Sequence, residues 1–231
     1  MEFYYLDTTN AIYCAMLLPI LAMAGNMAFA GSKDIRDIFT LICAILTFSC
    51  VLMILSNVGN GVTQATSLLN IFPGVDIAFS VEPLGLLFAI IASGLWILTH
   101  IYGVGYMRGN NEKHHARFFA CFCIAISSVI GIAFASNMFT LFLFYEILTV
   151  STYPLVAHKG TKESIRGARL YLSILIGTSI VLQLTAIIWT YVLTGTLDFT
   201  QGGILEGKVA GWIVPILLAL YAFGIGKAAL M

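Results

Sequence analysis

The stretch that decides the fold runs from Phe134 to Val156 and reads FASNMFTLFLFYEILTVSTYPLV. Its only charged residue, Glu146, lies nine residues after Asn137. On a helix that rises ~1.5 Å per residue, this carboxyl group lies roughly 13 Å inside a hydrocarbon layer about 30 Å thick. A carboxylate at that depth costs on the order of 2.5–3.5 kcal/mol to insert. The stretch therefore predicts a membrane helix whose acid has either a partner or a task.

The composition of the whole chain agrees with this interpretation. The chain has 231 residues, of which 60% are hydrophobic and only 10% charged, and its mean hydropathy is +0.97. A soluble domain carries about 25% charged residues, so we expect an integral membrane protein. Zero net charge argues against nucleic acid as a partner. All five cysteines fall inside apolar runs and are interpreted as small buried residues, and we expect neither a metal site nor a cofactor.

Seven apolar runs are long enough to span a bilayer, which predicts an all-α membrane protein with about seven transmembrane helices. The runs are Ala11–Ala30, Ile38–Ser56, Leu84–Val104, Phe118–Ala135, Met138–Val156, Leu170–Thr194 and Ala210–Met231. Acidic residues precede the first run where a cleaved signal peptide has basic ones, so we interpret it as a helix.

The positive charges predict the orientation of these helices. Nine of the eleven Lys and Arg residues fall in the loops Gly31–Asp37, Met107–Arg117 and His158–Arg169. These loops are therefore expected in the cytoplasm, with the N-terminus outside. The longest outer loop, Asn57–Pro83, has alternating apolar residues at Val75–Val81 that fit either a small hairpin or an irregular covering loop.

A second deep charge is the candidate partner of the central glutamate. Lys227 lies fifteen residues after Trp212, roughly 22 Å along the last helix. Gly224 and Gly226 precede it, and glycines let a membrane helix open locally. Burial favours the neutral acid whereas a nearby ammonium favours the carboxylate, so the pair can exchange a proton as the ammonium moves. The alternative is a fixed ion pair between two helices, but ionisable residues within membranes are usually functional.

Five further polar residues are candidate members of a proton relay. Thr149 and Tyr153 share a helix face with the glutamate and form a strip of hydroxyls that leads toward the cytoplasm. His100 fits a relay or, as we favour, an interfacial imidazole bonded to a carbonyl or water. His158 is more simply the solvated end of a helix than a proton exit. Gln183 fits a hydrated path and a bond between helices equally well.

Several segments of the sequence, including those that carry the two deep charges, resemble segments of a known family. Tyr145–Val156 resembles helix five of the antiporter-like subunits, which Mrp-type sodium/proton antiporters, respiratory complex I and membrane-bound hydrogenases share. Gly224–Met231 resembles the lysine motif of their helix seven. Leu84–Ala89 and Gly105–Arg108 resemble their helix three, and Thr194–Phe199 their loop between helices six and seven. The separation of the two deep charges is close to that of the Mrp D-type subunit.

The resemblance implies a proton-conducting membrane subunit without its own redox cofactor. It implies that Glu146 and Lys227 form the switching pair of a first half-channel. It also implies a subunit of fourteen helices with two inverted five-helix repeats. Residues 1–117 would then hold three N-terminal helices with an outer loop at 57–83, and residues 118–231 an incomplete first repeat.

The chain departs from the family by ending within the seventh helix, before the second repeat. We expect a split subunit whose second half is another chain, a truncated product, or an incompletely determined sequence. The leading hypothesis is the N-terminal half of a D-type subunit in a multisubunit Na+/H+ antiporter of the inner (plasma) membrane. Its partners would be other subunits, H+, Na+ and lipid. The alternative is the equivalent proton-pumping subunit of a membrane-bound hydrogenase or NADH:quinone oxidoreductase. The deep charges argue against a seven-helix receptor and a purely structural subunit.

Overall fold

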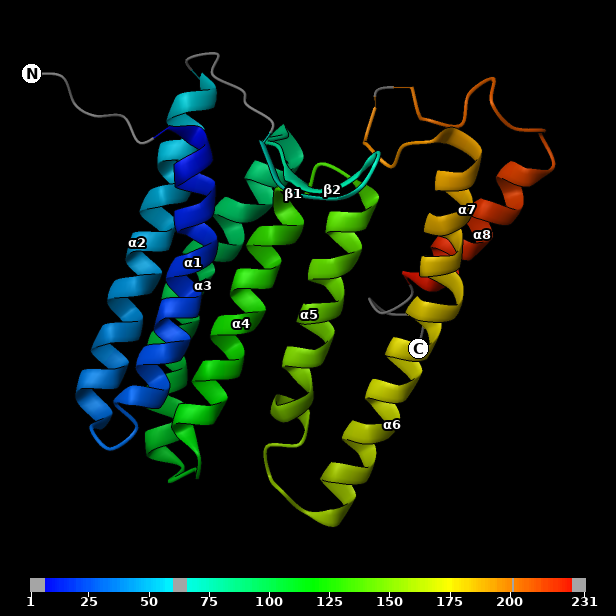
Figure 1. Cartoon of the computed structure of the whole chain (residues 1–231). Helices are drawn as coiled ribbons and strands as arrows, with labels where there is room; N and C mark the ends of the chain where they lie inside the picture. The colour runs from blue at the N-terminus through cyan, green and yellow to red at the C-terminus, as the bar shows by residue number, and fades with distance from the viewer. Residues whose placement is uncertain (1–6, 60–65, 201, 226–231) are drawn as a thin grey trace, which may run out of the picture.

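The computed structural model describes residues 7–59, 66–200 and 202–225, which form a row of helices with a small hairpin at one end (Figure 1). The helices are α1 (Thr8–Ala28), α2 (Lys33–Gly59), α3 (Pro83–Gly109), α4 (His115–Ala133), α5 (Met138–Val156), α6 (Lys162–Thr178), the π-helical η1 (Ser179–Leu184), α7 (Thr185–Thr194) and α8 (Ile213–Gly224).

Within the described residues, six helical spans are long and apolar enough to cross a membrane. They are α1 to α5 and the continuous helix Lys162–Thr194, which α6, η1 and α7 form together. This confirms the predicted all-α membrane fold. The sixth span begins at Lys162 instead of the expected Leu170, because the Thr161 side chain caps it by accepting a hydrogen bond from the Ser164 amide. The seventh, α8, is described over twelve residues only.

The first four helices share one apolar core. α1 packs against α2 and α4, and α4 packs against α3 and α5. Ile12, Phe79 and Ile130 are completely buried in the same cluster, although they come from α1, the hairpin and α4. The predicted division of the chain at residue 117 stays a prediction, and helices on both sides of that residue contribute to this core.

The outer loop contains a β-hairpin, which decides between the two interpretations of its sequence, a small hairpin and an irregular covering loop, in favour of the hairpin. Strand β1 (Thr66–Phe72) pairs antiparallel with β2 (Val75–Phe79), and Gly74 turns between them with φ +82°. The Asn137 side chain accepts a hydrogen bond from the Thr140 amide and donates one to the Asp76 carbonyl, at 2.7 and 2.8 Å. The hairpin therefore fixes the start of α5, the helix that carries Glu146.

The two ends of the bundle differ in charge. Figure 1 shows the hairpin, the start of α1 and the α7–α8 connection at one end. The connections α1–α2, α3–α4 and α5–α6 lie at the opposite end, and they hold the cationic loops identified above. This arrangement agrees with the orientation that the positive-inside rule predicts.

Two glycines of α3 provide a matched test of helix packing. A Cβ added at Gly85 would overlap the Ala133 carbonyl at the end of α4, whereas one at Gly105 would meet no atom within 4 Å. We expect Gly85→Ala to lower the free energy of unfolding by about 1–3 kcal/mol through overpacking. Gly105→Ala should be neutral or stabilise the helix by roughly 0.5–1 kcal/mol. Thermal unfolding in detergent measures both, and equal destabilisation would contradict the close approach of α3 and α4.

Candidate functional site

Glu146 lies in the middle of α5, which packs against α4 and α6, and its side chain is half-buried. The neighbouring Tyr145 hydroxyl donates a hydrogen bond of 3.1 Å to the Ile225 carbonyl, just beyond the end of α8. This bond brings α8 against α5 beside the glutamate. Glu146 itself is not isolated within the structure.

Lys227 and Gly226 lie outside the described residues, so the predicted pairing of Glu146 with Lys227 stays a prediction. The described part of α8 ends at Gly224, and the predicted opening of the helix at Gly224 and Gly226 stays a prediction. Gly224 is buried against η1, and an added Cβ would lie 2.6 Å from the Gln183 amide nitrogen. Glycine at this position therefore allows α8 to approach the π-helix closely.

The π-helix η1 interrupts the helix Lys162–Thr194 and carries Gln183. The Gln183 side chain is 2% exposed, and its amide oxygen has no hydrogen-bond partner among the described residues. An unpaired buried acceptor costs roughly 1–3 kcal/mol, and π-helical turns occur frequently at functional sites. The structure thus places this predicted relay residue at the contact with α8. The π-helix was not predicted, because no Pro or Gly within it signals the change of helix type.

The threonine hydroxyls of the predicted strip on α5 donate hydrogen bonds to backbone carbonyls of the same helix. The Thr149 hydroxyl donates to the Tyr145 carbonyl and the Thr152 hydroxyl to the Thr149 carbonyl, each at 2.8 Å. Ser and Thr hydroxyls in apolar surroundings commonly bond in this way to carbonyls three or four residues back. Tyr153 is half-buried. Proton transfer through Thr149 and Tyr153 stays a prediction, and it requires these local bonds to exchange.

His100 of α3 makes the kind of contact that the sequence analysis favoured. It is 3% exposed, and its Nε2 lies 3.0 Å from the Asp37 carbonyl oxygen. Its ring also packs edge-on against Phe119, with 5.0 Å between the ring centres. A bond to a carbonyl implies the Nε2–H tautomer, which leaves Nδ1 as an acceptor. That nitrogen is buried and has no partner in the described part of the chain.

A cluster of buried charges beside His100 was missed in the sequence. The Asp37 carboxylate lies 2.7 Å from Arg36 and 2.6 Å from Arg108, and Arg108 also reaches Asp34 at 2.8 Å. Arg36 and Asp37 are almost fully buried. The basic residues were counted only for orientation. The available signal was the pair of aspartates three residues apart at the start of α2, opposite an arginine at the end of the antiparallel α3.

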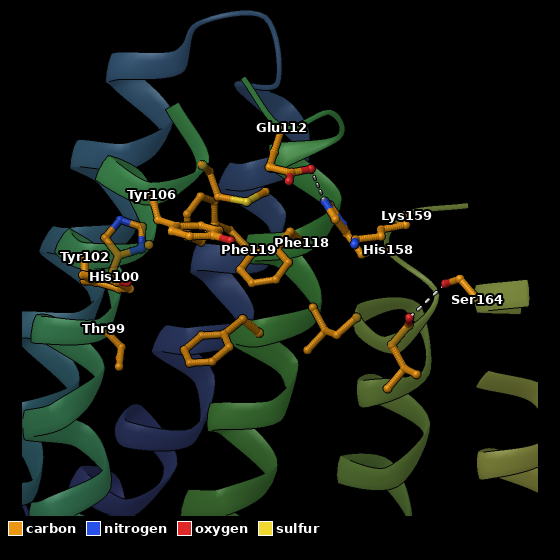
Figure 2. A pocket seen from close by; sticks show the side chains of 15 residues that line it. Thr99, His100, Tyr102, Tyr106, Glu112, Phe118, Phe119, His158, Lys159 and Ser164 are labelled. Atoms are coloured by element: carbon orange, nitrogen blue, oxygen red, sulfur yellow. Dashed lines mark hydrogen bonds and ion pairs between the residues drawn. The ribbon is translucent and has the colours of Figure 1, made fainter. Parts of the chain in front are cut away.

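A cavity of about 480 Å³, which we call the inner cavity, lies between α3, α4 and the end of α5 (Figure 2). The structure brings together two of the relay candidates here, because His100 and His158 both line it. The His158 Nε2 lies 3.9 Å from a Glu112 carboxylate oxygen. Burial is the main cause that lowers the pKa of His158 below its ordinary value, and Arg117 contributes, while Glu112 opposes the shift.

The lowered pKa of His158 predicts how stability depends on pH. The unfolded chain, with an ordinary pKa of about 6.5, takes up this proton more readily than the folded protein does. Stability is therefore lost as the pH falls through 6.5 toward the folded pKa. We expect His158→Gln to reduce the loss of thermal stability between about pH 7 and pH 5. His114→Gln, which removes an exposed imidazole from the same end, is the control. Identical pH profiles for the H158Q variant and the parent protein would contradict the prediction.

Two family models match the sequence. The model described as "NADH-Ubiquinone oxidoreductase (complex I), chain 5 N-terminus" matches residues 73–119. The model described as "NADH:quinone oxidoreductase/Mrp antiporter, TM" matches residues 135–230. The second match includes both Glu146 and Lys227, so the two deep charges fall in the same matched region.

Individual relatives agree with these models. The chain is 25% identical over 219 residues to NADH-ubiquinone oxidoreductase chain 5 of Allomyces macrogynus, which covers 92% of this chain and 33% of the relative. It is 27% identical over 165 residues to Na(+)/H(+) antiporter subunit A1 of Staphylococcus aureus (strain bovine RF122 / ET3-1), covering 69% and 20%. The chain thus spans about a third or less of the length of these relatives.

A solved structure shares the fold. A chain of the membrane-bound sulfane sulfur reductase, an archaeal respiratory membrane complex, superposes with a TM-score of 0.79 at 18% sequence identity. The superposition covers 95% of this chain and 34% of that one. The arrangement of helices described above is therefore shared with about a third of that chain.

Proposed function

We propose that this chain is a proton-translocating subunit of a multisubunit Na+/H+ antiporter, because it matches models and relatives of the antiporter-like membrane subunits that NADH:quinone oxidoreductases and Mrp antiporters share. Glu146 and Lys227 exchange protons in a half-channel between α5 and the end of α8. The chain acts as an ion-transport subunit rather than as an enzyme.

The contact between Tyr145 and Ile225 carries this proposal. The hydrogen bond joins the residue before Glu146 to the residue two positions before Lys227. A lysine side chain is long and flexible, and changes its protonation readily when buried. The bond therefore supports the proposed pairing of Glu146 with Lys227.

The surroundings of this contact suit a pair that switches. When the ammonium approaches, its charge favours the ionised form of Glu146; when it withdraws, the apolar helix favours the protonated acid. The backbone and Cβ of Gln183 lie against Gly224 of α8, and its buried side-chain oxygen, which has no partner among the described residues, is available to accept a hydrogen bond. The local bonds of Thr149 hold the hydroxyl strip in place until a proton is passed along it.

The proposed setting is a multi-pass subunit of the inner (plasma) membrane. Other subunits of the complex are its partners, including a chain that supplies the second half of the subunit, and the D-type subunit is the proposed equivalent. The Mrp relative reported above is an A1 subunit, which supports the family without distinguishing between the two types. H+ and Na+ are the proposed ions.

A proton-pumping subunit of a redox-driven complex is the second candidate. The relative in Allomyces macrogynus is an NADH-ubiquinone oxidoreductase chain, and the similar solved structure belongs to a respiratory complex. The membrane pair would work in the same way, while the driving reaction would come from other subunits.

Transport assays on inverted vesicles that contain the native complex separate the two candidates. An antiporter moves protons when a Na+ gradient is imposed, without an electron donor. A redox-driven subunit moves them only when NADH or another donor is oxidised. An intact-mass inventory of the purified complex tests the partners in parallel. Donor-dependent pumping without a response to Na+ would replace the antiporter proposal with the alternative.

A further inference from the structure

We propose that the inner cavity binds a phospholipid of the cytoplasmic leaflet whose headgroup carries both a phosphate and an ammonium group. The acyl chain would occupy the cavity between α3, α4 and α5. The headgroup would lie between Lys159 and Glu112. This site is separate from the proposed proton-transfer pair and does not depend on it.

The body of the cavity has the chemistry of an acyl-chain site. Its walls are formed mainly by apolar side chains of three helices, namely Met107, Phe118, Phe119, Phe122, Leu155 and Val156. Its volume of about 480 Å³ lies within the usual range of small-molecule pockets, roughly 300–1,000 Å³. Water needs two to four polar partners to be held in a cavity, and these walls offer few. An apolar ligand therefore suits this space better than a water chain.

The mouth of the cavity faces the side of the bundle. Tyr102 and Tyr106 of α3 line it and are 71% and 53% exposed, and Val156 at the end of α5 is 46% exposed. The two tyrosine rings stack on each other with 6.1 Å between their centres. Aromatic rings of this kind are typical of the membrane–water interface. A lipid can thus enter sideways from the bilayer at the level of the headgroups.

The two charged residues of the lining, Glu112 and Lys159, lie in the connections at the end that carries the cationic loops. Figure 2 shows His158, Lys159 and Ser164 to one side of the aromatic rings, with Glu112 joined to His158 by a dashed line, whereas Thr99 and His100 lie on the opposite side. The Ser164 hydroxyl donates to the Val156 carbonyl at 3.1 Å, so its oxygen can still accept a hydrogen bond.

The charges at this end match a zwitterionic headgroup. The lining contains one cation, Lys159, and one anion, Glu112. Lys159 would bind the phosphate by a charge-assisted hydrogen bond. Glu112 would bind the ammonium, because its neighbour His158 is 3.9 Å away and burial disfavours the charged imidazole. Phosphatidylethanolamine presents both groups, whereas phosphatidylglycerol presents the phosphate alone.

Native mass spectrometry of the purified complex tests the headgroup assignment, after exchange into vesicles of equal phosphatidylethanolamine and phosphatidylglycerol. Lys159→Glu should lower the occupancy of both lipids roughly ten-fold or more, the loss expected of one charge-assisted bond. Glu112→Gln should selectively reduce the preference for phosphatidylethanolamine. Lys162→Glu is the matched control, because it makes the same charge change on the exposed first residue of α6, three positions further on, which does not line the cavity. Equal losses in the K159E and K162E variants, or equal binding of the two lipids by the parent complex, would overturn the proposal.

Brominated lipids give a second readout that does not depend on charge. Phe122→Trp replaces one aromatic wall residue of the cavity by another, and bromine on an acyl chain quenches tryptophan on contact. We expect the fluorescence added by F122W to be quenched more by brominated phosphatidylethanolamine than by brominated phosphatidylglycerol. Lack of quenching by either lipid would mean that another subunit or no ligand fills the cavity, and would overturn the proposal.

Discussion

Replacing Glu146 by Gln is expected to reduce ion-driven proton movement to the level of vesicles that lack the complex. Glutamine keeps the size and hydrogen-bonding capacity of the side chain but cannot carry the proton that the proposed exchange requires. The α5 helix holds this residue half-buried beside the end of α8, where the exchange is proposed to take place. The fluorescence of an acridine dye in inverted vesicles measures the proton movement.

Three further variants make this result specific. Lys227→Ala should abolish transport as well, and the double variant should be no worse than either single one, because the two residues act as a unit. Glu163→Gln is the control, since it removes an exposed carboxylate from the first turn of α6. Full activity with both Glu146 and Lys227 replaced would assign the pair a structural role only. Immunoblots of the vesicles must show equal amounts of each assembled complex.

The sequence predicts the membrane spans well and their details less well. Long apolar runs report the first five spans within a few residues, because a helix must satisfy its own backbone in a bilayer. The choice between a hairpin and an irregular loop could not be made from the sequence, because β1 shows no clear alternation of buried and exposed residues. Leu68, Leu69, Ile71 and Phe72 are all largely exposed. The pairing of β1 with β2 is also irregular, with two shifts of register. Local sequence cannot predict such a strand without its partner.

Some residues of the candidate site could be predicted from the sequence, whereas others could be found only in the structure. Glu146 and Lys227 stand out because each is a charge within an apolar run, which the sequence alone reveals. Gln183 could not be assigned, since its position against α8 depends on a π-helix and on the absence of a side chain at Gly224. Asp37 was overlooked because its partner Arg108 is 71 residues away. Contacts between helices depend on packing, which periodicity within one helix does not contain.

Asp37→Asn is expected to lower the free energy of unfolding by about 3–5 kcal/mol, the usual cost of removing one partner of a buried ion pair. The change keeps the shape of the side chain but removes the charge that faces both Arg36 and Arg108. Arg36 is only 2% exposed, so water cannot replace the lost carboxylate. Thermal unfolding in detergent measures the loss.

Asp34→Asn is the matched control, because the same substitution is made one helical turn earlier on a side chain that also pairs with Arg108 but is 81% exposed. Exposed ion pairs contribute less than about 1 kcal/mol, so the D34N variant should remain close to the parent protein. A rescue separates lost charge from lost packing. Replacing Arg36 and Asp37 together by leucine removes the buried pair, which is often neutral, and Arg108 is exposed enough to be solvated. If the double variant is no more stable than D37N, the cost lies in packing or in the position of the carbonyl that His100 contacts, and the cluster is not held together by its charges.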